Sequence, residues 1–582
     1  MAEPLRPMTA VPPSGLRRVL AWFPILTAGV FVLPVVVGLL GTWLPAFGYL
    51  PVLGARDFGF SAWAYVFQHP SLPKALFLSV WTAWASTLLC LIMTLLILSL
   101  TWDSRSLRGL RRSLSALLAV PHAAFAIGIA ALIAPSGWLL KLVSPSLTGF
   151  DLPPNFSLVK DPWGISLMLV LTLKEAPFVL FMALAALNQL QVDRSLRMAR
   201  SLGYSAFLAW WRVIIPQLLP LIRLPMFAVL AYGLSVVDMA MILGPNAPPT
   251  LAILVHRWFN SPDILLRLPG SAGATLLLVV TLVSLLLWWM GECGLRRLLK
   301  WRLTGGRRTS IWQHFTWPAV SLNALLIAAA VGSFLVLLVW SFAFRWSFPD
   351  ALPEQYSTRF WVRGWNQLLQ LLWLTLYTGL AAAVIGLVLV VGCLEHEVTL
   401  RRTKPHYNGP RTLWLVYVPL IVPQIAFLFG VQVVLVWFSL DGHWLTLLWS
   451  HLMFVVPYIF LSLSGPYRSF DDRYLRQATL LRGSELRALW QVKWPMLLRP
   501  LLYVSALAFA VSLAQYLPTL YVGAGRFATI TTETVNIASG GDRRIVAVYA
   551  LFQWLAPMVI YSLALIIPAW RFRHRRAMQL GT

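Results

Sequence analysis

Long apolar stretches separated by short polar stretches run through the whole 582-residue chain. Many windows of about 20 residues are almost wholly apolar, which is the length a helix needs to cross the hydrocarbon core of a bilayer. The sequence therefore predicts an all-α polytopic membrane protein with about 12 transmembrane helices. The predicted spans lie near residues 21–44, 76–100, 113–134, 164–187, 217–243, 273–292, 318–343, 371–394, 412–438, 445–464, 500–521 and 546–569.

The twelve spans form two sets of six, so the chain divides into two halves of similar length. We expect a cytoplasmic tail at 1–20, a first repeat at 21–292, a cytoplasmic linker at 293–317, a second repeat at 318–570 and a cytoplasmic tail at 571–582. An even number of spans in each half predicts a parallel repeat, whose axis lies along the membrane normal.

One polar segment occurs once in each half. Residues 193–220 align without gaps on residues 472–499, at an offset of 279, with 13 identical pairs in 28 positions. Each copy has the pattern of a short helix, a turn, and a proline at the start of the next span. Pro216 and Pro495 suit that first helical turn, where no backbone donor is lost. The repetition indicates two similar surfaces for a partner.

A second internal match supports duplication of the chain. The segment PHAAFAIG (121–128) is similar to PQIAFLFG (423–430), with Pro, Ala, Phe and Gly shared at an offset of 302. The offset then falls to 279, because the loop after the third span is long in the first half (135–163) and short in the second (439–444).

Basic residues predict the orientation of the chain in the membrane. The net charge is +26, but the Lys and Arg residues lie in short loops between spans, as the positive-inside rule requires, so we expect no nucleic-acid partner. With the N-terminus inside, about 32 of the 46 Lys and Arg residues fall in inside segments, against about a dozen in the opposite orientation. Both termini and both repeated segments are therefore predicted to be cytoplasmic.

The sequence lacks the motifs of a nucleotide-binding or catalytic site. None of the seven Lys residues follows a Gly, so the chain has no P-loop, and ATP would have to be used by another polypeptide. No pair of His residues with a carboxylate has the spacing of a metal site on one helix face. We therefore expect no catalytic residues, no metal site and no cofactor bound by this chain.

Three charged residues fall inside predicted spans. Lys174 and Glu175 lie near the middle of the fourth span, Asp238 lies toward the outer end of the fifth, and an offset of 277 places Gln515 opposite Asp238. A charge at such a depth costs about 2.5–3.5 kcal/mol, so it normally faces the bundle interior. One interpretation is a packing pair of Lys174 with Glu175 or with Asp238. The other is a substrate pathway that Glu175 and Asp238 face, with Lys174 and Gln515 beside it.

Other polar or irregular positions in the spans have simpler explanations. His122 and His256 are expected to be interfacial or packing residues. Pro177 and Pro457 interrupt the fourth and tenth spans, where they form either local kinks satisfied by neighbouring groups or breaks that line a binding site.

The repeated segment resembles the cytoplasmic signature of binding-protein-dependent ABC importer permeases. That signature is Glu-Ala-Ala, three residues, Gly, nine residues and Ile-x-Leu-Pro. Arg replaces its Glu in both copies here, and the second Gly stands one place late. The matching residues are Arg197, Met198, Ala199, Gly203 and Pro216 in the first copy, and Arg476, Gln477, Ala478, Gly483 and Pro495 in the second.

The resemblance extends over nearly the whole chain, which is similar to a fused type I importer permease of the YnjC-like group, related to thiamine and ferric-iron permeases. It implies two six-helix halves in a bacterial inner membrane, in contact with lipid. It also implies two cytoplasmic coupling loops that dock onto separate ATPase subunits in two copies, and a periplasmic substrate-binding protein. ATP would be used by the partner subunit.

Two other classes of protein remain as alternatives. A secondary, ion-coupled transporter with a 6+6 repeat would use the intramembrane acids as proton carriers, but it has no need for the repeated loop. A membrane enzyme would need a clustered catalytic set, which the sequence lacks. The cargo also remains open, because Glu175 and Asp238 suit a cation whereas Lys174 suits an anion.

Overall fold

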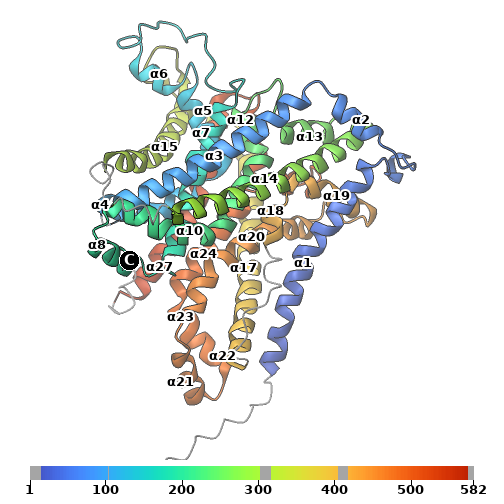
Figure 1. Ribbon diagram of the computed structural model, residues 1–582. Coiled ribbons are helices and arrows are strands. Elements are labelled where there is room, and N and C mark those ends of the chain that lie inside the picture. Colours follow the sequence, from blue (N-terminus) through green and yellow to red (C-terminus); the bar gives the residue numbers. More distant parts are fainter. Residues whose placement is uncertain (1–14, 103, 302–307, 309–315, 404–416, 574–582) are drawn as a thin grey trace, which may run out of the picture.

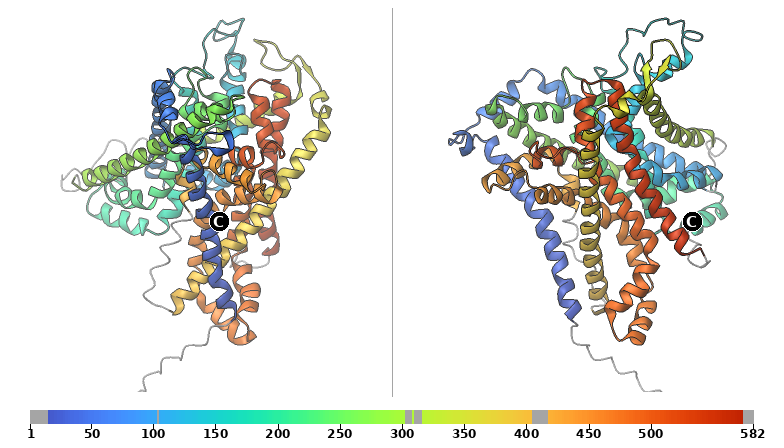
Figure 2. Two further views of the ribbon diagram at one scale, coloured as in Figure 1. Left: turned by 90° about the vertical axis from the view of Figure 1, so that its right-hand side faces the viewer. Right: turned by 180° about the vertical axis from the view of Figure 1, so that it is seen from behind.

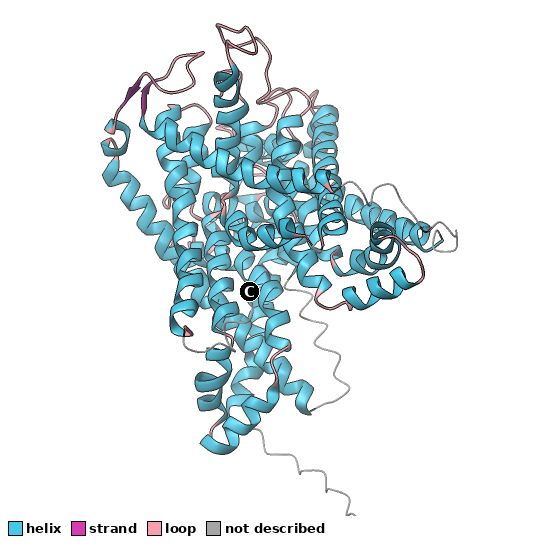
Figure 3. Cartoon of the chain, turned by 90° about the vertical axis from the view of Figure 1, so that its left-hand side faces the viewer, coloured by secondary structure: helices cyan, strands magenta, loops and turns pink. Residues whose placement is uncertain are grey.

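The computed structural model describes residues 15–102, 104–301, 308, 316–403 and 417–573. The outer parts of both predicted tails and most of the predicted linker at 302–315 lie outside the described residues. Within the part described, almost every element is a helix, and strands occur only in one hairpin (Figure 3).

The first half of the chain runs from α1 to α14 and the second half from α15 to α27 (Figure 1). The elements of the first half are α1 (Gly15–Ala46), η1 (Pro51–Leu53), α2 (Ser61–Gln68), α3 (Leu72–Thr101), α4 (Arg105–Ala119), α5 (His122–Ile133), α6 (Trp138–Val143), α7 (Ile165–Leu187), α8 (Val192–Ser201), α9 (Ala206–Ala209), η2 (Trp210–Ile214), α10 (Ile215–Leu221), α11 (Arg223–Ser235), α12 (Asp238–Leu243), α13 (Leu251–Phe259), η3 (Ile264–Leu266) and α14 (Arg267–Trp301). Those of the second half are α15 (Trp317–Phe342), β1 (Ala343–Arg345), β2 (Gln355–Tyr356), α16 (Arg359–Val362), α17 (Trp365–Thr403), α18 (Val418–Ile421), α19 (Gln424–Trp437), α20 (Trp444–Arg468), α21 (Asp472–Arg482), α22 (Glu485–Ala488), η7 (Leu489–Lys493), α23 (Trp494–Met496), α24 (Leu498–Leu513), α25 (Leu517–Val522), α26 (Ile530–Ala538) and α27 (Arg543–Arg571).

Each predicted span contains helix in the part of the chain that the structure describes. Nine helical segments there are long and apolar enough to cross a membrane, and two more form bent pairs, at α10/α11 and at α23/α24. The remaining predicted span contains α19, which is apolar but only 14 residues long. The prediction of an all-α polytopic membrane protein is therefore confirmed.

The first helix of each half packs against the other half. Helix α1 lies along α19 and α17, and α15 lies along α5 and α3 (Figures 1 and 2). Small residues permit this close approach. The backbone N–H of Gly430 on α19 donates to Thr42 Oγ1 on α1, and a Cβ at Gly430 would clash with the backbone of Gly38. On α5, a Cβ at Gly128 would lie 2.5 Å from Ser333 Cβ on α15. Gly128 and Gly430 are the glycines that end the two matching segments PHAAFAIG and PQIAFLFG.

Three predicted boundaries differ from the structure. Helices α14 and α17 continue beyond the predicted span ends at 292 and 394, because charged side chains at a helix end reach water while the backbone bonds continue. The predicted outer loop at 248–270 contains α13, a buried helix that packs on α14 and α3. Its apolar residues supply enough buried surface to order the segment.

Element boundaries repeat along the chain at the offset found in the sequence. Helices α7 and α20, α9 and α22, α12 and α25, and α13 and α26 begin 279 residues apart, as do the π-helical turns η2 and η7. Asp238, the first residue of α12, therefore corresponds to Leu517, the first residue of α25. The expected correspondence of Asp238 with Gln515 is wrong by two residues.

A hairpin of the second half contacts the long loop (135–163) that the sequence predicts to be an outer loop of the first half. Strand β1 pairs antiparallel with β2, with Ala343 opposite Tyr356. The Lys141 ammonium on α6 is buried beneath this hairpin, where it donates to the carbonyl oxygens of Trp346 (3.2 Å) and Ser347 (2.9 Å) and lies over the Trp346 ring. These contacts fix the outer loops of the two halves to each other.

Candidate functional site

A cavity of about 150 Å³ lies where four of the predicted spans are interrupted. The interruptions separate α4 from α5, α11 from α12, α18 from α19, and α24 from α25. Pro121 and Pro423 follow two of them, and a proline excludes the residue before it from helical geometry. Breaks inside spans are tolerated where the freed backbone lines a cavity, so the fold concentrates irregular backbone around one space.

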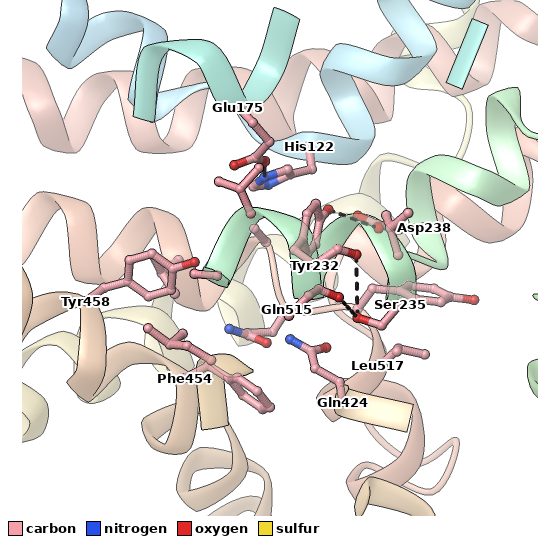
Figure 4. A pocket seen from close by; sticks show the side chains of 18 of the residues that line it. His122, Glu175, Tyr232, Ser235, Asp238, Gln424, Phe454, Tyr458, Gln515 and Leu517 are labelled. Carbon is pink, nitrogen blue, oxygen red and sulfur yellow. Dashed lines mark hydrogen bonds and ion pairs between the residues drawn. The ribbon is translucent and has the colours of Figure 1, made fainter. Parts of the chain in front are cut away.

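Each interruption also provides a polar side chain to the cavity. His122 and Gln424 are the first residues of α5 and α19, Asp238 is the first residue of α12, and Gln515 lies between α24 and α25. Figure 4 shows these four side chains around the same space. A helix that begins at the cavity thus presents its first side chain there.

Each carboxylate of the cavity has a histidine or tyrosine side chain within hydrogen-bond distance. Glu175 Oε1 lies 3.0 Å from His122 Nε2, and the Tyr232 hydroxyl donates to Asp238 Oδ1 over 3.5 Å (Figure 4). Lys174 is buried and lines the cavity, but among the described residues it forms no ion pair with Glu175 or Asp238. The predicted packing pairs of Lys174 are therefore wrong. Adjacent residues of a helix point about 100° apart, and Glu175 instead meets a histidine from another span.

The charged groups of the cavity all come from one half of the chain. Lys174, Glu175 and Asp238 belong to the first half, and at an offset of 279 they correspond to Met453, Phe454 and Leu517. The second half contributes Gln424, Gln515 and the Tyr458 phenol instead. One wall is therefore charged, and the other is amide and aromatic.

The prolines singled out in the fourth and tenth spans do not break them. Helices α7 and α20 continue through Pro177 and Pro457. The next residues, Phe178 and Tyr458, both line the cavity and meet edge to face, with ring centroids 6.1 Å apart. Of the two interpretations, a break of the helix at these prolines is therefore wrong.

The two repeated loops have the same local structure. A glycine with positive φ follows each helix: Gly203 (85°) lies two residues beyond the end of α8, and Gly483 (63°) directly follows α21. The hydroxyl of Ser205 or Ser484 then accepts a hydrogen bond from the N–H three residues on, which caps α9 or α22. A π-helical turn follows, and the chain then bends by 65° between α10 and α11 in the first half and by 77° between α23 and α24 in the second. Pro216 and Pro495 lie in the short helices α10 and α23 that precede these bends.

The loops also bury equivalent side chains. Ala199 and Ala478 face the body of the protein, whereas the residues before them are exposed to solvent. The exposed pairs are Arg197 with Met198 and Arg476 with Gln477. Figure 1 shows α21 at the lower end of the molecule and α8 at its left edge, whereas the α6 loop lies at the top.

Each loop is fastened to the spans by a different chemistry. In the first loop, the ring of Trp210 packs on Trp102, with centroids 5.2 Å apart, and Trp102 Nε1 donates to Asp193. In the second, Lys493 Nζ forms a 2.6 Å ion pair with Glu395 Oε2 on α17, and both side chains are buried. The position of Lys493 corresponds to apolar Ile214 in the first loop.

The whole-chain comparison decides the family. No protein-family model matches the chain. The chain is similar to the inner membrane ABC transporter permease protein YnjC of Escherichia coli (strain K12), with 32% identity over 514 residues, which are 87% of this chain and 90% of that protein. The chain belongs to the ABC transporter permease family. The permease is therefore a multi-pass protein of the inner membrane, and membership of an ABC system implies an ATPase partner.

Sequence reasoning found part of this permease's cavity. Lys174, Glu175, Asp238 and Gln515 all line it, and so does His122, for which the sequence predicts only an interfacial or packing role. The signal that could have identified His122 is its place after the proline of PHAAFAIG, the segment that recurs in the second half. In the described residues, no group of three or more His, Cys, Asp and Glu side chains is placed to hold a metal ion.

Proposed function

We propose that the permease is the transmembrane subunit of an ATP-driven importer. It would form the translocation pathway and couple to two separate ATPase subunits through the loops at 193–216 and 472–495. The observation that carries this proposal is the shared structure of these two loops: a helix and a glycine with positive φ, followed by a capped helix and a π-turn that each begin 279 residues apart in the two halves, and then a bend.

A repeated loop of this shape suits mechanical coupling. Its short helix is exposed on one side, where a partner subunit would bind, and buried on the other. A bend then leads directly into α11 or α24, and these helices end at the interruptions that line the cavity. Movement of either loop would therefore reach the cavity wall through a single helix.

The cavity is the proposed site where cargo passes. It lies at interrupted helices contributed by both halves, as binding sites do in other transporters built from repeats. ATP-driven closure of the two ATPase subunits would draw the loops together and move the halves relative to each other. The cavity would then open alternately to the two sides of the membrane, with a periplasmic binding protein delivering cargo to the outer face.

The proposed orientation places both termini and both loops in the cytoplasm. Its support is the distribution of Lys and Arg along the chain. We expect reagents that cannot cross the membrane to label a single cysteine placed at Leu481, on the second loop, only in inverted vesicles. A cysteine placed at Leu152, on the long outer loop, should be labelled only in intact cells with a permeable outer membrane. The reverse pattern would contradict the orientation.

The coupling proposal is tested by co-purification with the ATPase subunit and by ATP-dependent uptake in proteoliposomes. Gly203→Asp combined with Gly483→Asp places a side chain at two positive-φ turns. The altered loops should lose both the partner and uptake. A matched control is Gly54→Asp, which introduces the same strain at an exposed turn of the opposite face. Normal partner binding by the double variant would contradict the role of the loops.

The pathway proposal is tested separately at the cavity carboxylates. Glu175→Gln and Asp238→Asn keep the shape of the side chains but remove their charge. We expect each to reduce uptake while leaving association with the ATPase subunit intact. Normal uptake by both variants would remove these carboxylates from the pathway.

A secondary transporter remains the second candidate, because His122, Glu175 and Asp238, which are side chains able to carry protons, share the cavity. Uptake driven by a proton gradient without ATP, by the permease alone in proteoliposomes, would favour it. Uptake that requires ATP and the ATPase subunit would exclude it.

A further inference from the structure

The exposed sides of the two coupling loops carry the same side chains at the same places. Arg194 and Arg197 of α8 correspond to Arg473 and Arg476 of α21, at the offset of 279, and all four are exposed. Each set is followed by an exposed leucine. Leu202 is 63% exposed and Leu481 is 86% exposed. Each loop thus presents a basic helix face that ends in an apolar tip.

Arg194, Arg197, Arg473 and Arg476 form no ion pair within the described part of the chain. Arg194 donates to the Gln191 side chain and Arg197 to the Asp193 carbonyl oxygen, which are both neutral acceptors. The Asp193 carboxylate itself accepts the Trp102 indole N–H instead.

Several arginines that pack against helices near the proposed cytoplasmic side are paired. Arg223 forms a bidentate bond with Glu292, at 2.6 and 2.8 Å. Arg401 and Arg468 share Glu397. The chain therefore supplies carboxylates to arginines that pack against its own helices. It leaves the exposed faces of α8 and α21 positive.

Docking such a face onto another protein sets a condition on the partner. Removing an arginine from water without supplying a counter-charge costs far more free energy than the remaining contacts contribute. An exposed leucine, by contrast, gains from an apolar pocket. A surface that binds this face must therefore combine carboxylates with an apolar pocket beside them. Since both loops carry the same face, one kind of partner surface, used twice, would satisfy them.

We propose that the ATPase subunit binds each loop through an acidic cleft. Its carboxylates would meet the two arginines and its apolar pocket would hold the leucine. This inference rests on the proposed coupling function and adds the chemistry of the partner surface. It applies equally to both loops, because Arg occupies the equivalent position in each.

Charge reversal at both loops tests the inference. The measurement is the dissociation constant between the permease in nanodiscs and the purified ATPase subunit of its transport system, over a range of salt concentrations. We expect Arg197→Glu with Arg476→Glu to weaken binding about tenfold or more, because attraction becomes repulsion across a docked interface. We also expect wild-type affinity to fall as salt rises. Arg197→Lys with Arg476→Lys should retain most of the affinity.

The matched control reverses two arginines on another helix. Arg105→Glu with Arg108→Glu makes the same change of net charge at exposed positions of α4, on the same proposed side of the membrane. Binding by this control should stay within about twofold of wild type, because α4 carries no copy of the repeated loop. An equal loss in the control would overturn the inference in favour of general attraction to a basic surface.

The remaining outcomes separate the inference from the proposed function. Wild-type affinity in the loop reversal variant would overturn the acidic cleft but leave the coupling loops in place. No binding by the wild type would overturn both. A loss of binding that is restored by reversing a carboxylate of the ATPase subunit would establish the contact and exclude misfolding of the variant.

Discussion

The buried ion pair beneath the second repeated loop gives a prediction with a defined magnitude. Lys493 is fully buried and Glu395 is 4% exposed at the side chain, with 2.6 Å between Nζ and Oε2. The Tyr467 hydroxyl donates to the same carboxylate oxygen over 2.6 Å. Lys493→Met would leave the Glu395 charge buried without its cation. Breaking a buried pair in this way costs about 3–5 kcal/mol of unfolding free energy.

The double variant Lys493→Met with Glu395→Gln should be more stable than Lys493→Met alone. It removes both charges, and the new amide oxygen still accepts from Tyr467. The first loop supports this expectation, because buried Ile214 occupies the position that corresponds to Lys493. An apolar side chain is therefore compatible with the geometry of the π-turn. We expect a coupling free energy between the two substitutions of at least about 1 kcal/mol.

Reversible unfolding in mixed detergent micelles, followed by tryptophan fluorescence, measures these free energies. Lys300→Met is the matched control, because Lys300 is exposed near the end of α14. Its effect should stay within about 0.5 kcal/mol. The reasoning fails if Lys493→Met is no less stable than this control, or if the effects of the two substitutions at the pair simply add.

Two further predictions concern the packing and the outer face. Gly430→Ala should lower the unfolding free energy by about 1–3 kcal/mol or more, because the added Cβ clashes with the Gly38 backbone. The control is Gly465→Ala, whose added Cβ meets nothing within 4 Å. This control should be neutral or slightly stabilising in the same unfolding assay. The hydrogen bonds from Arg544 lower the pKa of the Asp542 carboxyl, so the charged form is favoured on folding. Asp542→Asn should therefore cost up to about 1 kcal/mol near neutral pH, since the pair is about one-third exposed, and the difference from wild type should vanish in unfolding curves as the pH falls below the lowered pKa.

The spans and the repeated loops could be predicted from the sequence because both depend on local patterns. A run of about 20 apolar residues is a sufficient condition for a membrane helix. The loop offset of 279 also predicts the boundaries of structural elements that lie far outside the matching segment, such as α13 and α26.

The interrupted helices could not be predicted, because proline has the same local effect wherever it stands in a span. Pro177 and Pro457 remain inside continuous helices, whereas breaks occur at Pro121 and Pro423. Which outcome occurs depends on whether neighbouring groups satisfy the freed carbonyls. That is decided by packing between spans. The pairing of His122 with Glu175 is equally non-local, because two different helices bring these residues together.

The two halves have the same residues at some equivalent positions of the loop surface and different residues at equivalent positions of the cavity. This difference follows from what each set of residues would contact. The outward arginines and leucines of the loops match at the offset of 279, as a surface must if it binds the same subunit twice. The cavity positions do not match, because the residues of the second half that are equivalent to Glu175 and Asp238 are neutral. In the proposed pathway, a cargo would enter the cavity in one orientation and would need no symmetry. The contacts beneath the loops, aromatic at Trp102 and ionic at Lys493, would meet neither the proposed partner nor the cargo. Either chemistry is sufficient there, provided that the loop moves with its span.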